Sequence, residues 1–458
     1  MTGRDFVFGV SGFRARTGES FTAANLVRFG NAFARLVKQR GGRVVSIARD
    51  TRLSGEAALG ALASALMLNG LDAVDFGIAP TPAALYAASH FEMDGSLTIT
   101  ASHNPAEWNG IEFAMERGRL LNASERRLLE AWFRNPPRTF APWNETGSLR
   151  VEEGAAEAHI ERVLSLQSVD AEAVRRRALR VVVDAGNGAG SIVSPTLMRR
   201  LGCETTELYC EPNGIFPRNP EPTEGSLDAL KAAVKEHGAD IGIAHDPDAD
   251  RTTLIDETGA FVPEEYTFAL TADVLLKERR GPIVTTVVTG ALLDETAQKH
   301  DVPILRTPVG VGHVVEKMAE TSAAVGGEST GGVVLPQVHL TTDGVAAAAV
   351  IASGLASRGG TLSDWVNEWG RYVLVKRKVR LTTRAPDVNR LAEAMSWAQE
   401  ASAETTDGLK LTWEDGSWVS VRPSGTEPVM RVFAESRDAA RAQELLNRAA
   451  DAVSRLLL

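Results

Sequence analysis

A chain of 458 residues is longer than a single hydrophobic core usually supports, so we expect about two to four domains. Its 44% hydrophobic and 24% charged residues are typical of a soluble globular protein, and a net charge of -10 argues against a large nucleic-acid surface. The longest apolar stretch, near Val345–Ala356, is too short to span a bilayer, which argues against a membrane protein.

Three segments of the chain repeat one plan, in which an apolar run leads through a polar or glycine-rich turn into a helix and then into a second apolar run. Helices are expected at Glu56–Leu68 in the first segment and up to about Leu201 in the second. The apolar runs, each expected to be a buried strand, are Val44–Ile47, Leu71–Phe76, Leu179–Val183, Pro282–Val288 and Val302–Arg306. Buried strands that alternate with helices indicate three similar α/β domains with mainly parallel, mixed sheets.

The last part of the chain has a different pattern. Tyr372–Leu381 alternates apolar and basic residues as a half-exposed strand does, and Leu391–Ala403 is expected to be helical. Further strands are expected at Leu409–Trp413 and Trp418–Val421, and Ser436 is the expected N-cap of a final helix. We therefore expect a C-terminal α+β domain, with domains at residues 1–153, 154–257, 258–371 and 372–458.

The cysteine count and the N-terminal segment bear on the cellular location of the protein. Cys203 and Cys210 are too few for a disulfide framework, and the N-terminal segment carries charges where a signal peptide needs an apolar region. We expect a cytoplasmic protein that is a monomer or homodimer. An anionic substrate would have to be held by local arginines or a metal ion, against the overall negative charge.

A serine loop, Thr100–Pro105, follows the apolar run Leu97–Ile99. It offers a hydroxyl, an imidazole and an amide at the end of an expected strand, where α/β proteins place their ligands. Taken alone, these residues fit an ordinary turn better, in which Asn104-Pro105 interrupts the regular secondary structure. The glycines of a serine-hydrolase elbow are absent.

An acidic loop, Asp246–Arg251, follows the expected strand Ile241–Ala244 and carries carboxylates at alternate positions, Asp246, Asp248 and Asp250. Carboxylates are hard oxygen ligands suited to Mg²⁺ or Ca²⁺. An EF-hand loop is excluded because its sixth position requires glycine and is Arg251 here. Close carboxylates repel one another, so a metal site is favoured over a solvated turn.

Two further loops carry groups that suit a polyol and a phosphate, respectively. Gly326–Gly332 combines a flexible backbone with one carboxylate and two hydroxyls, which can bind a polyol, although a ligand-free glycine turn is the simpler interpretation. Arg422–Pro428 places hydroxyls, backbone N–H groups and a guanidinium between two strands, with Arg431 three residues further on, and suits a phosphate dianion.

The order and spacing of the four loops resemble the α-D-phosphohexomutase superfamily, which includes phosphoglucomutase, phosphomannomutase and phosphoglucosamine mutase. The resemblance covers essentially the whole chain. Further matching segments are Phe8–Arg14, Ala48–Arg52, Asp184–Gly190 and Phe216–Pro222. The resemblance implies four domains around a central cleft, each contributing one loop.

The resemblance also implies roles for particular residues. Ser102 would carry the phosphoryl group, and Asp246, Asp248 and Asp250 would hold one Mg²⁺ per chain against it. Arg14, His103 and Arg251 complete the expected catalytic group. The residues expected to bind the sugar and its other phosphate are Glu328, Ser329, Thr330, Arg422, Ser424, Gly425, Thr426 and Arg431.

The chain departs from the family pattern at candidate proton-transfer positions. Glu112 replaces a lysine, Gly332 a histidine, and neither Pro308 nor Gly312 supplies a second lysine. Nearby substitutes by sequence are His103, Glu112, Arg16 and His313, while Glu112 fits a surface carboxylate without a role equally well.

The implied activity is interconversion of hexose 1-phosphate and 6-phosphate, with hexose 1,6-bisphosphate as intermediate and activator. The alternatives are a phosphoglucosamine mutase, a phosphosugar-binding protein with little turnover, and a Mg²⁺-dependent phosphatase that admits water.

Overall fold

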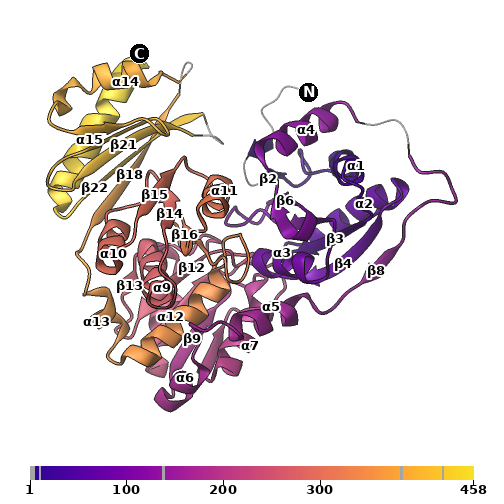
Figure 1. Cartoon of the computed structure of the whole chain (residues 1–458), viewed down its shortest axis with the longest axis horizontal. Coiled ribbons are helices and arrows are strands. Elements are labelled where there is room, and N and C mark those ends of the chain that lie inside the picture. Colours follow the sequence, from indigo (N-terminus) through magenta and orange to yellow (C-terminus); the bar gives the residue numbers. More distant parts are fainter. Residues whose placement is uncertain (1–5, 10–11, 137–139, 382–384, 425–427, 458) are drawn as a thin grey trace.

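Four β-sheets follow one another along the chain in the computed structural model, which describes residues 6–9, 12–136, 140–381, 385–424 and 428–457 (Figure 1). Each sheet, with the helices next to it in the chain, is called a domain, numbered first to fourth in chain order. This arrangement confirms the predicted fold class, three α/β domains followed by an α+β domain. None of the helices in the described ranges is long and apolar enough to cross a membrane.

The first sheet has eight strands, ordered β1-β2-β6-β5-β3-β4-β8, with β7 paired to β6. Its strands are β1 (Phe6–Gly9), β2 (Gly12–Arg16), β3 (Val44–Arg49), β4 (Asp72–Ile78), β5 (Gly95–Ile99), β6 (Trp108–Met115), β7 (Arg119–Leu120) and β8 (Leu149–Val151). Its helices are α1 (Ala23–Gln39), α2 (Gly55–Leu68), α3 (Thr81–His90) and α4 (Ala123–Arg134), with a 3₁₀ turn at Glu116–Gly118. Strand β5 is buried throughout and lies between β3 and β6, so the serine loop that follows it starts from the middle of the sheet.

The second sheet has the order β10-β9-β11-β12-β13 and the third the order β15-β14-β16-β17. The second domain contains β9 (Arg180–Asp184), β10 (Glu204–Leu208), β11 (Ile241–His245), β12 (Thr252–Asp256), β13 (Phe261–Val262), α5 (Ala155–Leu164), α6 (Ala171–Arg177), α7 (Gly190–Leu201), α8 (Asp228–His237) and a 3₁₀ turn at Glu224–Ser226. The third contains β14 (Ile283–Thr286), β15 (Ile304–Thr307), β16 (Val325–Gly327), β17 (Val333–Val334), α9 (Glu264–Glu278), α10 (Leu292–His300), α11 (Val311–Thr321), α12 (Gly344–Arg358) and α13 (Leu362–Val366).

The second and third domains share one hydrophobic core. Val183 and Leu197 of the second domain belong to the same buried cluster as Phe268, Val350 and Trp365 of the third. Since β13 pairs with β12, the second sheet also runs past residue 257 to Val262. The first and fourth domains have core clusters of their own.

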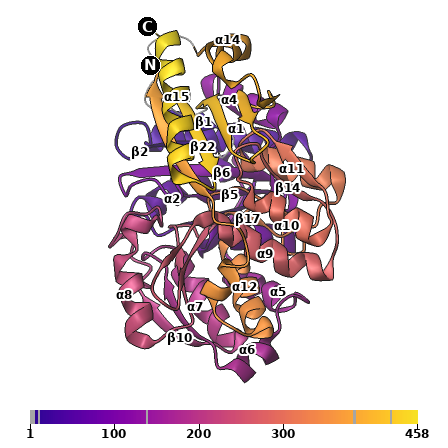
Figure 2. The ribbon, with the colours of Figure 1, turned by 90° about the vertical axis from the view of Figure 1, so that its left-hand side faces the viewer.

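The fourth sheet is antiparallel, with the order β18-β22-β21-β20-β19. Its elements are β18 (Val373–Arg380), β19 (Ser402–Glu404), β20 (Leu409–Thr412), β21 (Trp418–Pro423), β22 (Val429–Ser436), α14 (Val388–Ala394), α15 (Ala439–Leu456) and a 3₁₀ turn at Ser396–Ala398. Helices α14 and α15 pack on one face, which the apolar residues of β21 and β22 also form. Figures 1 and 2 both place this domain at the opposite end of the molecule from α6 and α7 of the second domain.

Two predictions for the fourth domain are wrong. The helix expected to reach Ala403 ends at Ala394, because the chain leaves the helix after Met395 and Ser402–Glu404 pairs with β20 instead. The N-cap of α15 is Asp438 and not Ser436, because Asp438 accepts a hydrogen bond from Ala440 N while Ser436 completes β22.

Candidate active site

The serine loop brings Ser102 to the second domain. Ser102 is buried, and its Oγ donates a hydrogen bond to Asp246 Oδ2 at 3.0 Å. The imidazole Nδ1 of His103 lies 3.1 Å from Ser102 Oγ. The backbone at Ser102 has φ of +47°, an unfavourable value for a residue other than glycine, so neighbouring groups must hold the loop in this conformation.

The acidic loop follows β11 and gathers its carboxylates at one point. Asp246, Asp248 and Asp250 each place one oxygen within 4.8 Å of the others. Thr81 Oγ1 donates to Asp248 Oδ2 and Thr342 Oγ1 to Asp250 Oδ2, whereas the Oδ1 atoms of both aspartates lack a hydrogen-bond partner among the described residues. Buried oxygens without partners are the donors expected at a hard-cation site.

The raised pKa values of these carboxylates also indicate a site for a cation. Burial, followed by the charges of Asp250 and Asp248, raises the pKa of Asp246 well above its ordinary value. Burial and the neighbouring carboxylates raise the pKa of Asp248 to about 7. A divalent cation would offset this repulsion, so the donor set fits Mg²⁺.

Positive charge from several domains surrounds Ser102. Arg14 Nη1 donates to Asn104 Oδ1 of the serine loop at 3.0 Å, and the Arg251 guanidinium lies 3.8 Å from both Asp250 and Glu221. The charge of Arg251, together with burial and further arginines, lowers the pKa of His103 to about 2. The imidazole is therefore neutral at physiological pH.

The third loop, Gly326–Gly332, which we call the sugar loop, lies close to the same charges. Glu328 Oε1 accepts a hydrogen bond from Gly310 N at 3.1 Å. Burial raises the pKa of Glu328, and the nearby positive charges of Arg251 and Arg422 oppose this shift. Ser329 is buried and Thr330 is half-buried. Glu328 thus lies between the acidic loop and the fourth domain.

The fourth domain carries a row of cations across three strands. Arg422 of β21 is directly opposite Arg431 of β22, which in turn is opposite Lys378 of β18. Opposed like charges on a sheet destabilise it unless an anion lies between them. Arg422 Nε donates to Asp407 Oδ2 at 2.8 Å, and the same oxygen accepts Val309 N of the third domain at 3.0 Å.

The fourth loop, Arg422–Pro428, which we call the phosphate loop, is only partly described. Ser424 N donates to Val429 O at 2.9 Å, which closes the loop between β21 and β22. Gly425 and Thr426 lie outside the described residues. The expected phosphate site can therefore be followed at Arg422, Ser424 and Arg431.

The substitute proton carriers fall into different surroundings. Glu112 of β6 has its pKa raised to about 8 by burial and by Asp248 and Asp250, which places it beside the acidic loop. Arg16 is instead directed to Glu19 and lies over the Trp108 ring. His313 lies in the first turn of α11 and is half-buried.

Sequence reasoning missed several residues that hold this site. They are Asp50, Arg52, Thr81, Thr342, Lys378 and Asp407. Only Asp50 and Arg52 had a signal, since they belong to the matching segment Ala48–Arg52. Thr81, Thr342 and Asp407 contact partners across domain boundaries, and Lys378 is opposite Arg431 through strand pairing, neither of which a local pattern reveals.

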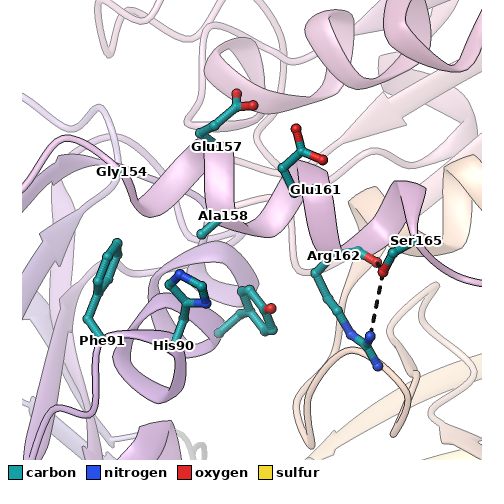
Figure 3. A pocket seen from close by; sticks show the side chains of 9 residues that line it. His90, Phe91, Gly154, Glu157, Ala158, Glu161, Arg162 and Ser165 are labelled. Atoms are coloured by element: carbon teal, nitrogen blue, oxygen red, sulfur yellow. Dashed lines mark hydrogen bonds between the residues drawn. The ribbon is translucent and has the colours of Figure 1, made fainter.

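A separate pocket of about 560 Å³ lies between α3 and α5. It is lined by aromatic residues such as Tyr86 and Phe91 and by residues of α5 such as Glu157 and Glu161 (Figure 3). None of the four loops contributes to its lining. It is therefore distinct from the candidate active site.

Comparison with known proteins assigns the family. Models of phosphoglucomutase/phosphomannomutase α/β/α domains I, II and III match residues 5–138, 157–259 and 263–372, and the C-terminal domain model matches residues 374–452. The chain is 40% identical to the phosphoglucomutase/phosphomannomutase of Thermococcus kodakarensis, over 96% of both chains. It is 37% identical to a Pyrococcus abyssi protein named "Probable phosphoglucosamine mutase", again over 96% of both chains.

A solved structure agrees with this assignment. The crystal structure of a phosphoglucomutase/phosphomannomutase family protein from Burkholderia thailandensis matches with a TM-score of 0.86 and 28% identity, covering 98% of this chain and 97% of that one. The chain belongs to the phosphoglucomutase/phosphomannomutase family, within the α-D-phosphohexomutases, which are isomerases of the phosphotransferase type.

Proposed function

We propose that this protein interconverts hexose 1-phosphate and hexose 6-phosphate through a phosphorylated Ser102. The observation that carries the proposal is the 3.0 Å contact between Ser102 Oγ and Asp246 Oδ2, which joins the serine loop to the acidic loop. A hydroxyl beside a carboxylate cluster and several arginines suits phosphoryl transfer, which depends mainly on positioning and charge neutralisation.

Asp246, Asp248 and Asp250 would hold Mg²⁺ together with the Ser102 oxygen. The bound ion would supply positive charge that stabilises the transferring phosphoryl group. Arg14 and Arg251 add to this charge from the first and second domains. The chain thus supplies a cationic environment at the one point where the charge develops.

The transfer exchanges one phosphorus–oxygen bond for another. The bond to Ser102 Oγ breaks, a bond to a free sugar hydroxyl oxygen forms, and the proton of that hydroxyl passes to a base. Ser102 Oγ takes up a proton when the phosphoryl group leaves, and the neutral His103 imidazole, whose Nδ1 lies 3.1 Å away, can accept a hydrogen bond from the hydroxyl that forms. The resulting hexose 1,6-bisphosphate then reorients within the site, so that its other phosphate faces Ser102, and returns that phosphoryl group to Ser102.

The other phosphate of the substrate is held by the cation row of the fourth domain, and the sugar hydroxyls by the sugar loop. Arg422 and Arg431 would bind the phosphate that does not react, and Ser424, Gly425 and Thr426 would complete that site. Glu328, Ser329 and Thr330 would bind the sugar. A glucosamine phosphate is the second candidate substrate, because relatives with both names match at similar identity.

The test follows glucose, mannose and glucosamine 1-phosphates separately by ³¹P NMR, with Mg²⁺ and a trace of the matching 1,6-bisphosphate. Appearance of the 6-phosphate supports the mutase and identifies the preferred sugar. Release of free phosphate would instead indicate a phosphatase. Binding without conversion of any of the three sugars would leave a phosphosugar-binding protein and refute the proposal.

A further inference from the structure

Arg52 is almost completely buried behind the serine loop, with 2% of its surface exposed. Its Nη2 donates to the carbonyl oxygens of Ser102 at 2.6 Å and Asn104 at 2.7 Å. Its Nη1 donates to the carbonyl oxygens of Pro105 at 2.7 Å and Trp108 at 2.8 Å. One guanidinium therefore binds four carbonyl groups of a seven-residue stretch that begins at the reactive serine.

Asp50 fixes the orientation of this guanidinium. Its Oδ2 accepts from Arg52 Nε at 3.0 Å and from Thr100 Oγ1 at 2.8 Å, and its Oδ1 accepts from Arg52 N at 2.9 Å. Thr100 Oγ1 in turn accepts from Ser102 N at 2.9 Å. The serine is thus held on its N–H side through Thr100 and on its carbonyl side by Arg52.

These contacts explain how an unfavourable backbone conformation persists. The φ of +47° at Ser102 costs energy in a residue with a side chain, and charge-assisted hydrogen bonds to the carbonyls offset that cost. The second domain also contacts the segment that contains Arg52, since Thr51 Oγ1 donates to Asn187 O at 2.8 Å and Arg52 lies over the Phe216 ring. The direction of Ser102 Oγ toward Asp246 therefore depends on Arg52.

We propose that Arg52 is a positioning residue of the phosphoryl-transfer reaction, which aims Ser102 at the acidic loop without contacting the substrate. The inference rests on the proposed mutase function and adds a residue to it. Arg52 lies on the interior side of the serine loop, whereas the sugar and its anchored phosphate would be bound by the third and fourth domains. Its loss should lower kcat and leave KM nearly unchanged.

The second domain repeats the arrangement, which supports the inference independently. Asp184 is the last residue of β9, much as Asp50 comes directly after β3, and its Oδ2 accepts from Arg218 Nε at 2.9 Å. Arg218 Nη2 donates to His245 O at 2.7 Å, the carbonyl that immediately precedes Asp246. A buried aspartate and arginine thus hold the backbone of each loop that meets at the Ser102–Asp246 contact.

The test compares Arg52→Met and Arg52→Lys with the wild type, per folded molecule. We expect kcat to fall about 100-fold in Arg52→Met with KM within about threefold, since small misplacements of a reacting group cost about this much. Arg52→Lys should recover part of the rate because an ammonium can donate to some of the four carbonyls. The single-turnover rate of Ser102 phosphorylation by hexose 1,6-bisphosphate, followed by intact mass, should fall in parallel with kcat.

Arg162→Met is the matched control. Like Arg52, Arg162 donates to a backbone carbonyl oxygen, Gln337 O at 2.8 Å, but this contact joins the second and third domains and lies at the separate pocket (Figure 3). It should lower the melting temperature without lowering kcat per folded molecule. Should Arg52→Met lose stability and rate only to the extent of Arg162→Met, Arg52 is merely structural and the inference is wrong.

Thr100→Val provides a milder probe in case Arg52→Met fails to fold. It removes the hydroxyl that links Asp50 to Ser102 N, and kcat should fall about tenfold with KM unchanged. Wild-type kcat in both Thr100→Val and Arg52→Lys would overturn the inference. A wild-type protein that neither isomerises a hexose phosphate nor becomes phosphorylated on Ser102 refutes the proposed function instead, and the inference falls with it.

Discussion

Replacing Arg422 tests whether the fourth domain anchors the phosphate that does not react. The hydrogen bond from Arg422 to Asp407 uses Nε, so that bond leaves both terminal NH₂ groups to a phosphate. A charge-assisted hydrogen bond contributes roughly 1.5–3 kcal/mol, and roughly 1.4 kcal/mol corresponds to tenfold in rate. Arg422→Ala should therefore lower kcat/KM by about one to two orders of magnitude.

The structure places the expected loss toward the upper end of this range. Removal of the guanidinium leaves the Asp407 carboxylate with Val309 N as its remaining recorded donor, and an uncompensated negative charge beside the site repels a phosphate dianion. Arg422→Lys should recover only part of the loss, because an ammonium cannot reproduce the bidentate fork. Phosphorylation of Ser102 by the bisphosphate should slow as well, since that reaction uses the same anchor.

Steady-state kinetics on the two variants, with Arg377→Ala as control, measure the effect. Arg377 is next to Lys378 in β18, but it donates to Asn447 of α15 and so belongs to the helix-covered face of the sheet. Arg377→Ala should keep wild-type kinetics. Unchanged kcat/KM in Arg422→Ala would place the anchor elsewhere, with Arg431 the next candidate.

Three further variants address the reacting centre. Ser102→Ala should abolish turnover and the phosphorylated fraction seen by intact mass, while sugar-phosphate binding measured by calorimetry stays intact; wild-type rates would refute the mechanism. Asp248→Asn should weaken Mg²⁺ binding, because an amide is an uncharged ligand, and high Mg²⁺ or Mn²⁺ should partly rescue its activity. Activity that EDTA does not affect would remove the metal from the mechanism. His103→Gln should lower kcat by up to about tenfold, because it removes the imidazole hydrogen bond to Ser102 Oγ. The wild-type rate should show no imidazole titration near pH 6.5, because the pKa of His103 is held at about 2.

The strands and the loops that follow them could be predicted because both depend on local sequence. The run Ile241–Ala244 is apolar, and the strand that contains it, β11, is buried along its length, so the polar residues after it must lie at the end of a sheet. The alternation in β22, where Met430 and Val432 face α15 and Arg431 faces away, likewise follows from the strand period. The family resemblance supplied the loops' common centre, which no local pattern gives.

The failures arise where long-range pairing overrides local preference. The helical pattern through Ala403 is interrupted because Ser402–Glu404 gains the edge of a sheet by pairing with β20. Asp407 contacts Val309 across 98 positions of the chain, and Thr81 contacts Asp248 across 167. Such partners are set by how the domains pack, so their side chains look unremarkable in the sequence.

A pair of buried glutamates makes the contact between the third and fourth domains sensitive to pH. Glu265 of α9 and Glu435 of β22 approach the same glycine, since a Cβ added to Gly290 would lie 2.6 Å from Glu265 Oε2 and 2.0 Å from Glu435 Oε2. Glu435 Oε1 accepts from Trp418 Nε1 and Ala291 N, both at 2.8 Å. Burial and then the charge of Glu435 raise the pKa of Glu265 to about 8, so the pair retains a proton at neutral pH.

The sign of the effect on stability follows from proton uptake. Between the ordinary pKa of 4.5 and the raised value of about 8, the folded state binds the proton and the unfolded state does not. The free energy of unfolding should therefore be highest below pH 4.5 as far as this group is concerned, and should fall as pH rises toward 8. Glu265→Gln, which cannot ionise, should flatten this part of the pH dependence and unfold at a higher temperature than wild type at pH 8.

Thermal unfolding between pH 5 and 8.5 measures the difference between the variant and the wild type, in which contributions from other groups cancel. Glu264→Gln is the matched control: Glu264 is the half-buried neighbour on the same helix and the smallest of the causes that raise the pKa of Glu265, so this variant should keep nearly the wild-type slope. The positive charges that oppose the ionised pair are Lys376, Lys410 and Arg306. A wild-type slope in Glu265→Gln would mean that these cations already neutralise the pair and that the domain contact carries no shared proton.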